Sequence, residues 1–121
     1  MFCMTTSILL DHFACPRNAG TLPNATHRVE VSNPVCGDIL QLAAVVENGK
    51  VQEVRFLCRG CTASIACASL LTEHMQGRDS TSLRELSADS LAAAFGGLPT
   101  ATFHAAQLAH DALQALLRTL R

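Results

Sequence analysis

Two stretches with strand composition, residues 39–47 and 50–57, meet at Asn48-Gly49, and this junction constrains the fold more than any other feature of the sequence. An Asn-Gly pair between two such runs is the strongest short-range signal of a β-hairpin, because both residues tolerate positive φ. Upstream, the run HRVEV at 27–31 has the composition of another strand. The sequence therefore predicts three antiparallel strands.

Helical periodicity replaces strand alternation from Thr62 onward, and Gly77 suits the C-terminal end of the predicted helix. Either Thr62 or Ser64 is expected to cap its N-terminus. Two short helical pieces follow within 81–99, an amphipathic helix occupies most of 101–121, and another short helix precedes Pro16. The predicted fold class is α+β: a three-stranded antiparallel β-sheet packed against several α-helices.

The composition points to one domain, spanning residues 1–121, because 49% of the residues are hydrophobic and can form a core. A net charge of −1, with scattered charges, gives no electrostatic footprint for nucleic acid or an anionic membrane. No apolar run approaches the roughly 18 residues that a membrane-spanning helix needs. The N-terminal stretch lacks a basic region and a cleavage site, so we expect a cytoplasmic protein whose six cysteines are reduced.

The tripeptide Cys36-Gly37-Asp38 places a thiol and a carboxylate two residues apart in a predicted turn before a strand. Gly37 lets the backbone bend, so that both side chains can approach one point. Thiolate and carboxylate are both metal ligands, one soft and one hard. The alternative is structural: Asp38 caps a turn and Cys36 is buried.

Cys58 and Cys61 form a C-x-x-C, yet their predicted positions differ. Cys61 follows Gly60 at the strand-to-helix junction, where the helix dipole favours the thiolate that binds metal. Cys58 falls on the strand, on the side that alternation assigns to the core. A redox pair normally has both cysteines at the start of one helix, and a zinc site would need histidines from downstream. Cys67, further into the helix, is expected to fill the core.

His104 lies near the start of the last predicted helix, just after GGLPTATF. A lone histidine at such a position more often caps the helix or faces solvent than binds a metal. His12, His27 and His74 have no neighbouring residues with an identifiable chemistry. The histidines by themselves therefore leave the choice between a structural and a ligand role open.

Four segments, in order and at matching spacing, resemble the motifs of NifU/IscU-type iron–sulfur cluster assembly scaffolds over almost the whole chain. They are DHFACPRNAG, NPVCGDILQL, VRFLCRGCTASIACASLLTEHMQG and LPTATFHAAQLAHDAL. The resemblance implies a three-stranded antiparallel sheet packed by helices, in agreement with the pattern of strands and helices above. It also implies a scaffold with no turnover chemistry of its own, and hence not an enzyme.

By position, the resemblance implies that Cys36, Asp38, Cys61 and His104 bind iron or a transient [2Fe–2S] cluster. Zn²⁺ is an alternative occupant of the same ligands. Members of this family receive sulfur from a cysteine desulfurase and pass clusters to iron–sulfur acceptor proteins, so both are implied partners here. A homodimer around a shared cluster is left open.

The chain departs from the family pattern at Ala105, where a ligand cysteine normally follows the histidine. The stretch LPTAT also lacks the basic residue of the family's chaperone-docking segment. Cys58 stands where the family usually has no cysteine, and a bulge at Arg59-Gly60 is one way for it to replace the missing thiol. The missing thiol equally favours a non-assembling zinc- or iron-binding relative that engages the desulfurase or regulates cluster supply. A thiol oxidoreductase and a module with inert thiols are the remaining alternatives.

Overall fold

The computed structural model describes residues 8–34, 37–98 and 103–120, and its sheet has the three strands that the sequence predicts. They are β1 (His27–Ser32), β2 (Ile39–Glu47) and β3 (Lys50–Arg59), in the order β1-β2-β3. Both neighbouring pairs are antiparallel. The prediction of a three-stranded antiparallel sheet is therefore confirmed.

The hairpin between β2 and β3 turns at Asn48-Gly49, as predicted. Both residues have positive φ, 54° at Asn48 and 76° at Gly49, which is the conformation that this turn type requires. Glu47 pairs with Lys50 across the turn, and the register shifts once, between Val45 and Val46. The turn residues thus bring β3 back along β2 with its last residues beside the first residues of β2.

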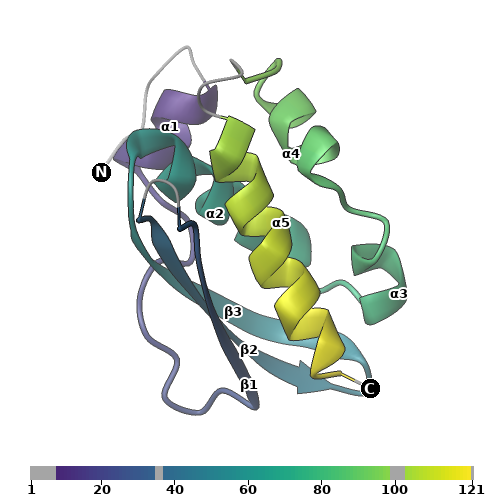
Figure 1. Cartoon of the computed structure of the whole chain (residues 1–121). Helices are drawn as coiled ribbons and strands as arrows, with labels where there is room; N and C mark the ends of the chain where they lie inside the picture. The colour runs from purple at the N-terminus through teal and green to yellow at the C-terminus, as the bar shows by residue number, and fades with distance from the viewer. Residues whose placement is uncertain (1–7, 35–36, 99–102, 121) are drawn as a thin grey trace.

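Five helices are present in the described residues: α1 (Ile8–Ala14), α2 (Thr62–Met75), α3 (Ser80–Leu83), α4 (Ala88–Ala94) and α5 (Phe103–Arg118). Figure 1 shows α2 and α5 packed side by side across the sheet, with α4 beyond α5 and α1 beside α2. α5 packs against the sheet mainly at β1 and β2, whereas α2 packs against β3. The fold is α+β, as predicted.

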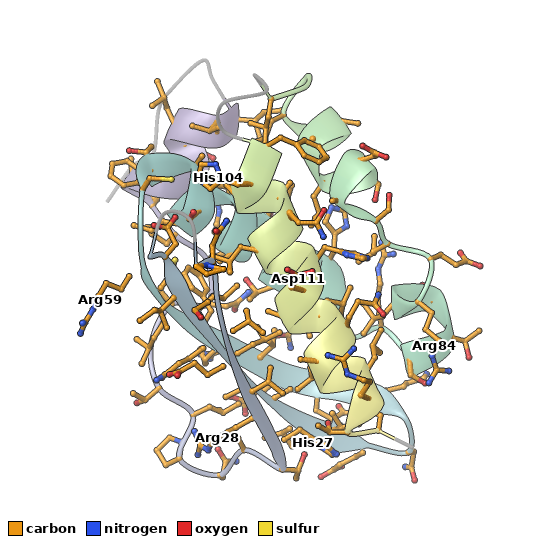
Figure 2. All side chains as sticks on the ribbon, viewed as in Figure 1. His27, Arg28, Arg59, Arg84, His104 and Asp111 are labelled. Carbon is orange, nitrogen blue, oxygen red and sulfur yellow. The ribbon has the colours of Figure 1, made fainter. Side chains whose placement is uncertain are left out.

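The core lies between the sheet and these two helices. Alternate residues of β2 are buried, whereas Gln41 is exposed, so one face of the sheet carries the core, as strand alternation requires. Figure 2 shows Arg59 of β3 projecting away from the helices, into solvent. The largest fully buried side chains of the sheet and of α2 and α5 are Leu40, Leu42, Val51, Val54, Leu71, Met75, Leu113 and Leu116.

His12 fastens α1 to α2, a role that the sequence did not indicate. Its ring is only 4% exposed. Nδ1 lies 2.7 Å from the Ser69 hydroxyl, Nε2 lies 3.3 Å from a Glu73 carboxylate oxygen, and the ring meets Phe95 edge-on. In the neutral tautomer that carries its proton on Nε2, the ring accepts a hydrogen bond from the Ser69 hydroxyl and donates to Glu73, while Ser69 Oγ also accepts the Arg17 N–H. A neutral His12 thus satisfies both partners.

The loop after α1 extends this attachment to the edge of the sheet. The Arg17 guanidinium pairs with Asp11, and Asn18 donates from its side-chain amide to the Thr72 hydroxyl at 3.2 Å. The backbone carbonyl of Asn18, a residue with φ of 61°, accepts the N–H of Phe56 in β3. The stretch that carries the first family-like motif therefore binds α2 to β3.

The thiols of the described residues divide into three free ones and one that is oxidised. Cys67 is fully buried, as predicted, and burial raises the pKa of its thiol to about 12. Cys58 and Cys61 are also free. Cys15, however, is disulfide-bonded, so the expectation of reduced thiols was wrong there. That expectation rested on the absence of an export signal, which says nothing of which thiols the fold brings within reach.

No helix among the described residues is long and apolar enough to cross a membrane. The longest, α5, has sixteen residues and one predominantly apolar side. The prediction that the last segment is an amphipathic helix is confirmed.

Replacing His12 with Ala is expected to lower the free energy of unfolding by about 1–3 kcal/mol, because the Ser69 hydroxyl loses a buried partner. Burial, and then the nearby Arg17, lower the pKa of His12 below its usual 6.5, so the folded protein keeps the ring neutral. The unfolded chain then binds the extra proton first, and the stability that His12 contributes is present above pH 6.5 and lost as the pH falls below it. Urea unfolding at several pH values measures both effects.

The matched control is His27→Ala, since His27 is the first residue of β1 and its ring contacts the exposed Thr26 hydroxyl. It should change neither the stability nor its pH dependence by a comparable amount. Equal losses in the two variants, or an unchanged pH dependence after His12→Ala, would contradict the role assigned to His12.

Candidate metal site

Three of the four predicted ligands come together at one corner of the fold. Asp38 immediately precedes β2, Cys61 lies between β3 and α2, and His104 belongs to the first turn of α5. One ligand atom of each lies within 4.8 Å of the others. Figure 2 shows His104 at the start of α5, beside the first turn of α2. Residues 38, 61 and 104 are distant in sequence, so only the fold brings them together.

Backbone hydrogen bonds within the loop before β2 hold Asp38 in position. The Gly37 N–H donates to the carbonyl of Asn33 at 2.7 Å, and the Asn33 N–H donates to the carbonyl of Asp38 at 2.8 Å. Gly37 has φ of 77°, so the bend that the sequence suggested does require a glycine. Cys36, the remaining predicted ligand, lies outside the described residues.

The Asp38 carboxylate sits at the N-terminus of α2. It is 7% exposed, accepts a hydrogen bond from the Ser64 hydroxyl, and lies 3.5 Å from the N–H of Cys61. Cys61 is the N-cap residue and makes no side-chain capping bond, so the expected caps, Thr62 and Ser64, do not act in that way. The hydroxyl of Ser64 is taken by Asp38 instead. The Asp38 carboxylate, from the loop before β2, thus caps the N-terminus of α2, where the helix dipole is positive.

Gly60 is required here for space rather than for backbone freedom. A Cβ on Gly60 would lie 2.7 Å from Cγ and 2.8 Å from Oδ2 of Asp38. Any larger residue would therefore push the carboxylate out of its position. Sequence reasoning used Gly60 only to mark the end of the strand, and no local signal reveals a clash with a residue 22 positions earlier.

The thiol and the imidazole face each other across the site. Cys61 Sγ lies 3.9 Å from His104 Nε2 and 3.3 Å from the Ser64 hydroxyl. Cys61 is exposed, whereas His104 is half-buried. A thiolate, an imidazole and a carboxylate suit Zn²⁺ and also mixed-ligand iron–sulfur centres, which take histidine beside cysteine. The donor set therefore fits the group that the resemblance implies.

Cys58 and Ala105 flank this set without belonging to it. Cys58 is half-buried on β3 and packs against the core, as alternation predicted. Burial raises the pKa of the Cys58 thiol to about 11, and the nearby Asp38 and Cys61 contribute in the same direction. Ala105, next to His104, is fully buried in the core. The C-x-x-C thus separates into one exposed thiol at the site and one thiol that remains protonated beneath the surface.

Gly60→Ala is expected to destabilise the protein by about 1–3 kcal/mol, because the added methyl group overpacks against Asp38. Urea unfolding measures this cost in the wild type and again in an Asp38→Ala background, which removes the carboxyl atoms that the methyl group meets. The cost should be smaller in that background. An equal cost in both backgrounds would show that Gly60 is needed for another reason.

Ser64→Ala is expected to weaken Zn²⁺ binding roughly 10–100-fold, because second-sphere hydrogen bonds orient ligating carboxylates. Competition with a chromophoric chelator measures the affinity. Ser69→Ala is the matched control on the same helix: it removes the partner of His12 and should cost stability, but not Zn²⁺ affinity. Loss of affinity in both variants to the same degree would point to general destabilisation.

Comparison with known proteins identifies the family of the chain. Residues 4–120 match the family described as NifU-like N terminal domain. Among curated proteins, the chain is 36% identical to the iron-sulfur cluster assembly scaffold protein IscU 1 of Archaeoglobus fulgidus, over 92% of this chain and 72% of that protein. It is also 36% identical to the scaffold protein IscU of Haemophilus influenzae, over 90% and 89% of the two chains.

Among solved structures, the N-terminal part of a NifU-like protein from Brucella abortus superposes with a TM-score of 0.74. It is 17% identical in sequence, and the match covers 93% of this chain and 91% of that one. This likeness concerns the fold, whereas the match to the family and the identity to the IscU proteins concern descent. The chain belongs to the NifU/IscU family of iron–sulfur cluster assembly scaffolds, which are not enzymes.

Proposed function

We propose that this protein holds iron and sulfide while they are assembled into a [2Fe–2S] cluster, and then passes the cluster to acceptor proteins. The observation that carries this proposal is the convergence of Asp38, Cys61 and His104 from three elements to within 4.8 Å. Cys36 is the proposed fourth ligand, from its place two residues before Asp38. Two thiolates, a carboxylate and an imidazole suit tetrahedral coordination of iron or zinc.

The ligands are proposed to differ in how firmly they hold the cargo. Cys61 supplies a soft thiolate, the preferred ligand of cluster iron. Asp38 supplies a hard carboxylate, one of whose oxygens is already engaged by Ser64 and directed at the start of α2. The cluster competes with these hydrogen bonds for the carboxylate. Asp38 is therefore the ligand that exchanges most readily when an acceptor takes the cluster.

The exposure of Cys61 supports a role in receiving sulfur. Its thiol lies at the N-terminus of α2 and is accessible to a partner, whereas the thiols of Cys58 and Cys67 are withdrawn into the fold. We infer that the donor is a cysteine desulfurase, which delivers sulfur as a persulfide. An external electron donor then supplies the two electrons that convert each transferred sulfur to sulfide. We infer that the acceptors are apo iron–sulfur proteins. We also propose that the chain is a single domain that works in the cytoplasm, where the free thiol of Cys61 stays reduced. A homodimer around one cluster is compatible with it.

One observation favours a second function. Ala105 stands where the family has a ligand thiol. Its methyl side chain has no ligand atom, and the residue is fully buried. With one thiolate fewer, the same residues make a zinc or iron site that does not assemble clusters. Such a protein would engage the desulfurase or regulate cluster supply. The two functions differ in whether sulfide enters the site.

Anaerobic reconstitution of the full chain with Fe³⁺ and sulfide separates these functions. We expect visible sulfur-to-iron charge-transfer absorption, with iron and sulfide in equal amounts by elemental analysis. Cys61→Ser should abolish the absorption, whereas Cys67→Ala, which alters a core thiol, should retain it. Absorption that is absent from the wild type, or that persists in Cys61→Ser, would reject assembly. Stoichiometric zinc with no bound sulfide would support the second function.

A further inference from the structure

We propose that Cys58 supplies a further thiolate to the cluster on this scaffold, in place of the thiol that the chain lacks at Ala105. This inference rests on the proposed function, since it concerns a cluster and not a single ion. It assigns a cluster-binding role to a cysteine that stands where the family pattern has none.

The register of the sheet places Cys58 beneath the metal site. Leu40 pairs with Cys58 and Ile39 pairs with Arg59, so the next pair in the same register is Asp38 with Gly60. The close approach of Gly60 to the Asp38 side chain agrees with this pairing. Asp38 and Cys58 are therefore diagonal neighbours on one face of the sheet, a relation that places such residues roughly 7–8 Å apart.

The face that carries Cys58 is the one that faces the helices. Figure 2 shows Arg59 projecting away from them, and adjacent residues of a strand point to opposite faces. Cys58 accordingly packs against the core and is half-buried. Its electrostatic interaction with both Asp38 and Cys61 is consistent with this proximity. No bulge at Arg59-Gly60 is needed to direct Cys58 to the site, because Asp38 already lies on the same face.

No side chain of the intervening residues separates Cys58 from Cys61. Arg59 points outward, and Gly60 has no side chain. The Cys58 thiol is outside the group of donors that lie within 4.8 Å of one another. That distance suits ligands of one ion. A two-iron cluster separates the ligands of its two irons by more than this, so it can reach a thiol that a single ion at Asp38, Cys61 and His104 cannot.

Coordination by Cys58 is a substitution at iron that involves no oxidation. The S–H bond breaks and the proton is released to water, since thiols bind metals as thiolates, while an Fe–S bond forms and the bond from iron to the exchangeable Asp38 carboxylate breaks. Metal binding therefore has to offset the burial that keeps the Cys58 thiol protonated. The result is a cluster anchored on its inner side by a ligand from β3, with the exposed Cys61 on its outer side.

This arrangement predicts that Cys58 matters for the cluster and not for a single ion. In Cys58→Ala and Cys58→Ser, reconstituted with Fe³⁺ and sulfide, the rate of cluster loss to a chelator should rise roughly tenfold or more. Cys58→Ser should also shift the charge-transfer bands to shorter wavelength if oxygen replaces sulfur on iron. Zn²⁺ affinity, measured by chelator competition on samples of the same variants, should stay within about twofold of the wild type. An unchanged Zn²⁺ affinity also confirms that each variant is folded.

Cys67→Ala is the matched control, because it removes another withdrawn thiol that lies within α2 and is fully buried. Its cluster should have wild-type spectra and a wild-type rate of loss. Wild-type cluster stability and spectra in both Cys58 variants would overturn the role of Cys58 while leaving the proposed function intact. The same loss in Cys67→Ala as in the Cys58 variants would also overturn it, since core packing would then explain the effect. Failure of the wild type to form any cluster would reject the proposed function itself.

Discussion

The contact between the Asp38 carboxylate and the start of α2 is the interaction on which the site depends. It joins the beginning of β2, the end of β3 and the N-terminus of a helix at one point. A buried carboxylate is costly unless it is hydrogen-bonded, and here Ser64 and the helix terminus satisfy it while Gly60 leaves it room. The same arrangement positions Cys61 beside the carboxylate. The contact between Asp38 and the start of α2 therefore both stabilises this corner of the fold and places the candidate ligands Asp38 and Cys61 next to each other.

The remaining elements hold the two partners of this contact in place. The second half of α2 is held by His12, at Ser69, and by the loop after α1, at Thr72. That loop also binds the edge of β3. α5 packs against α2 through its apolar side and carries His104 to the site from its first turn. Because Asp38, Cys61 and His104 lie in or next to elements that are packed against one another, the fold itself brings these three candidate ligands together.

The three described free thiols differ in burial, and burial explains their separate roles. Cys61 is exposed at a helix start, Cys58 is half-buried on a strand, and Cys67 is enclosed in the core. Burial raises the pKa of the two inner thiols, so only the outer one is accessible for direct exchange with a partner. In sequence, the C-x-x-C spacing suggests a pair. In the fold, a thiol on a strand and a thiol at a helix cap have different environments.

The sequence by itself determined the hairpin at Asn48-Gly49, the three strands, the helices and the identity of the ligand candidates, because turn chemistry, periodicity and motif order are local properties. Only the tertiary structure decided that Asp38 caps α2, that Gly60 must lack a side chain and that His12 is a buried anchor. Each of these depends on a partner distant in sequence. Such contacts leave no periodic or compositional trace, since packing alone determines which side chains meet.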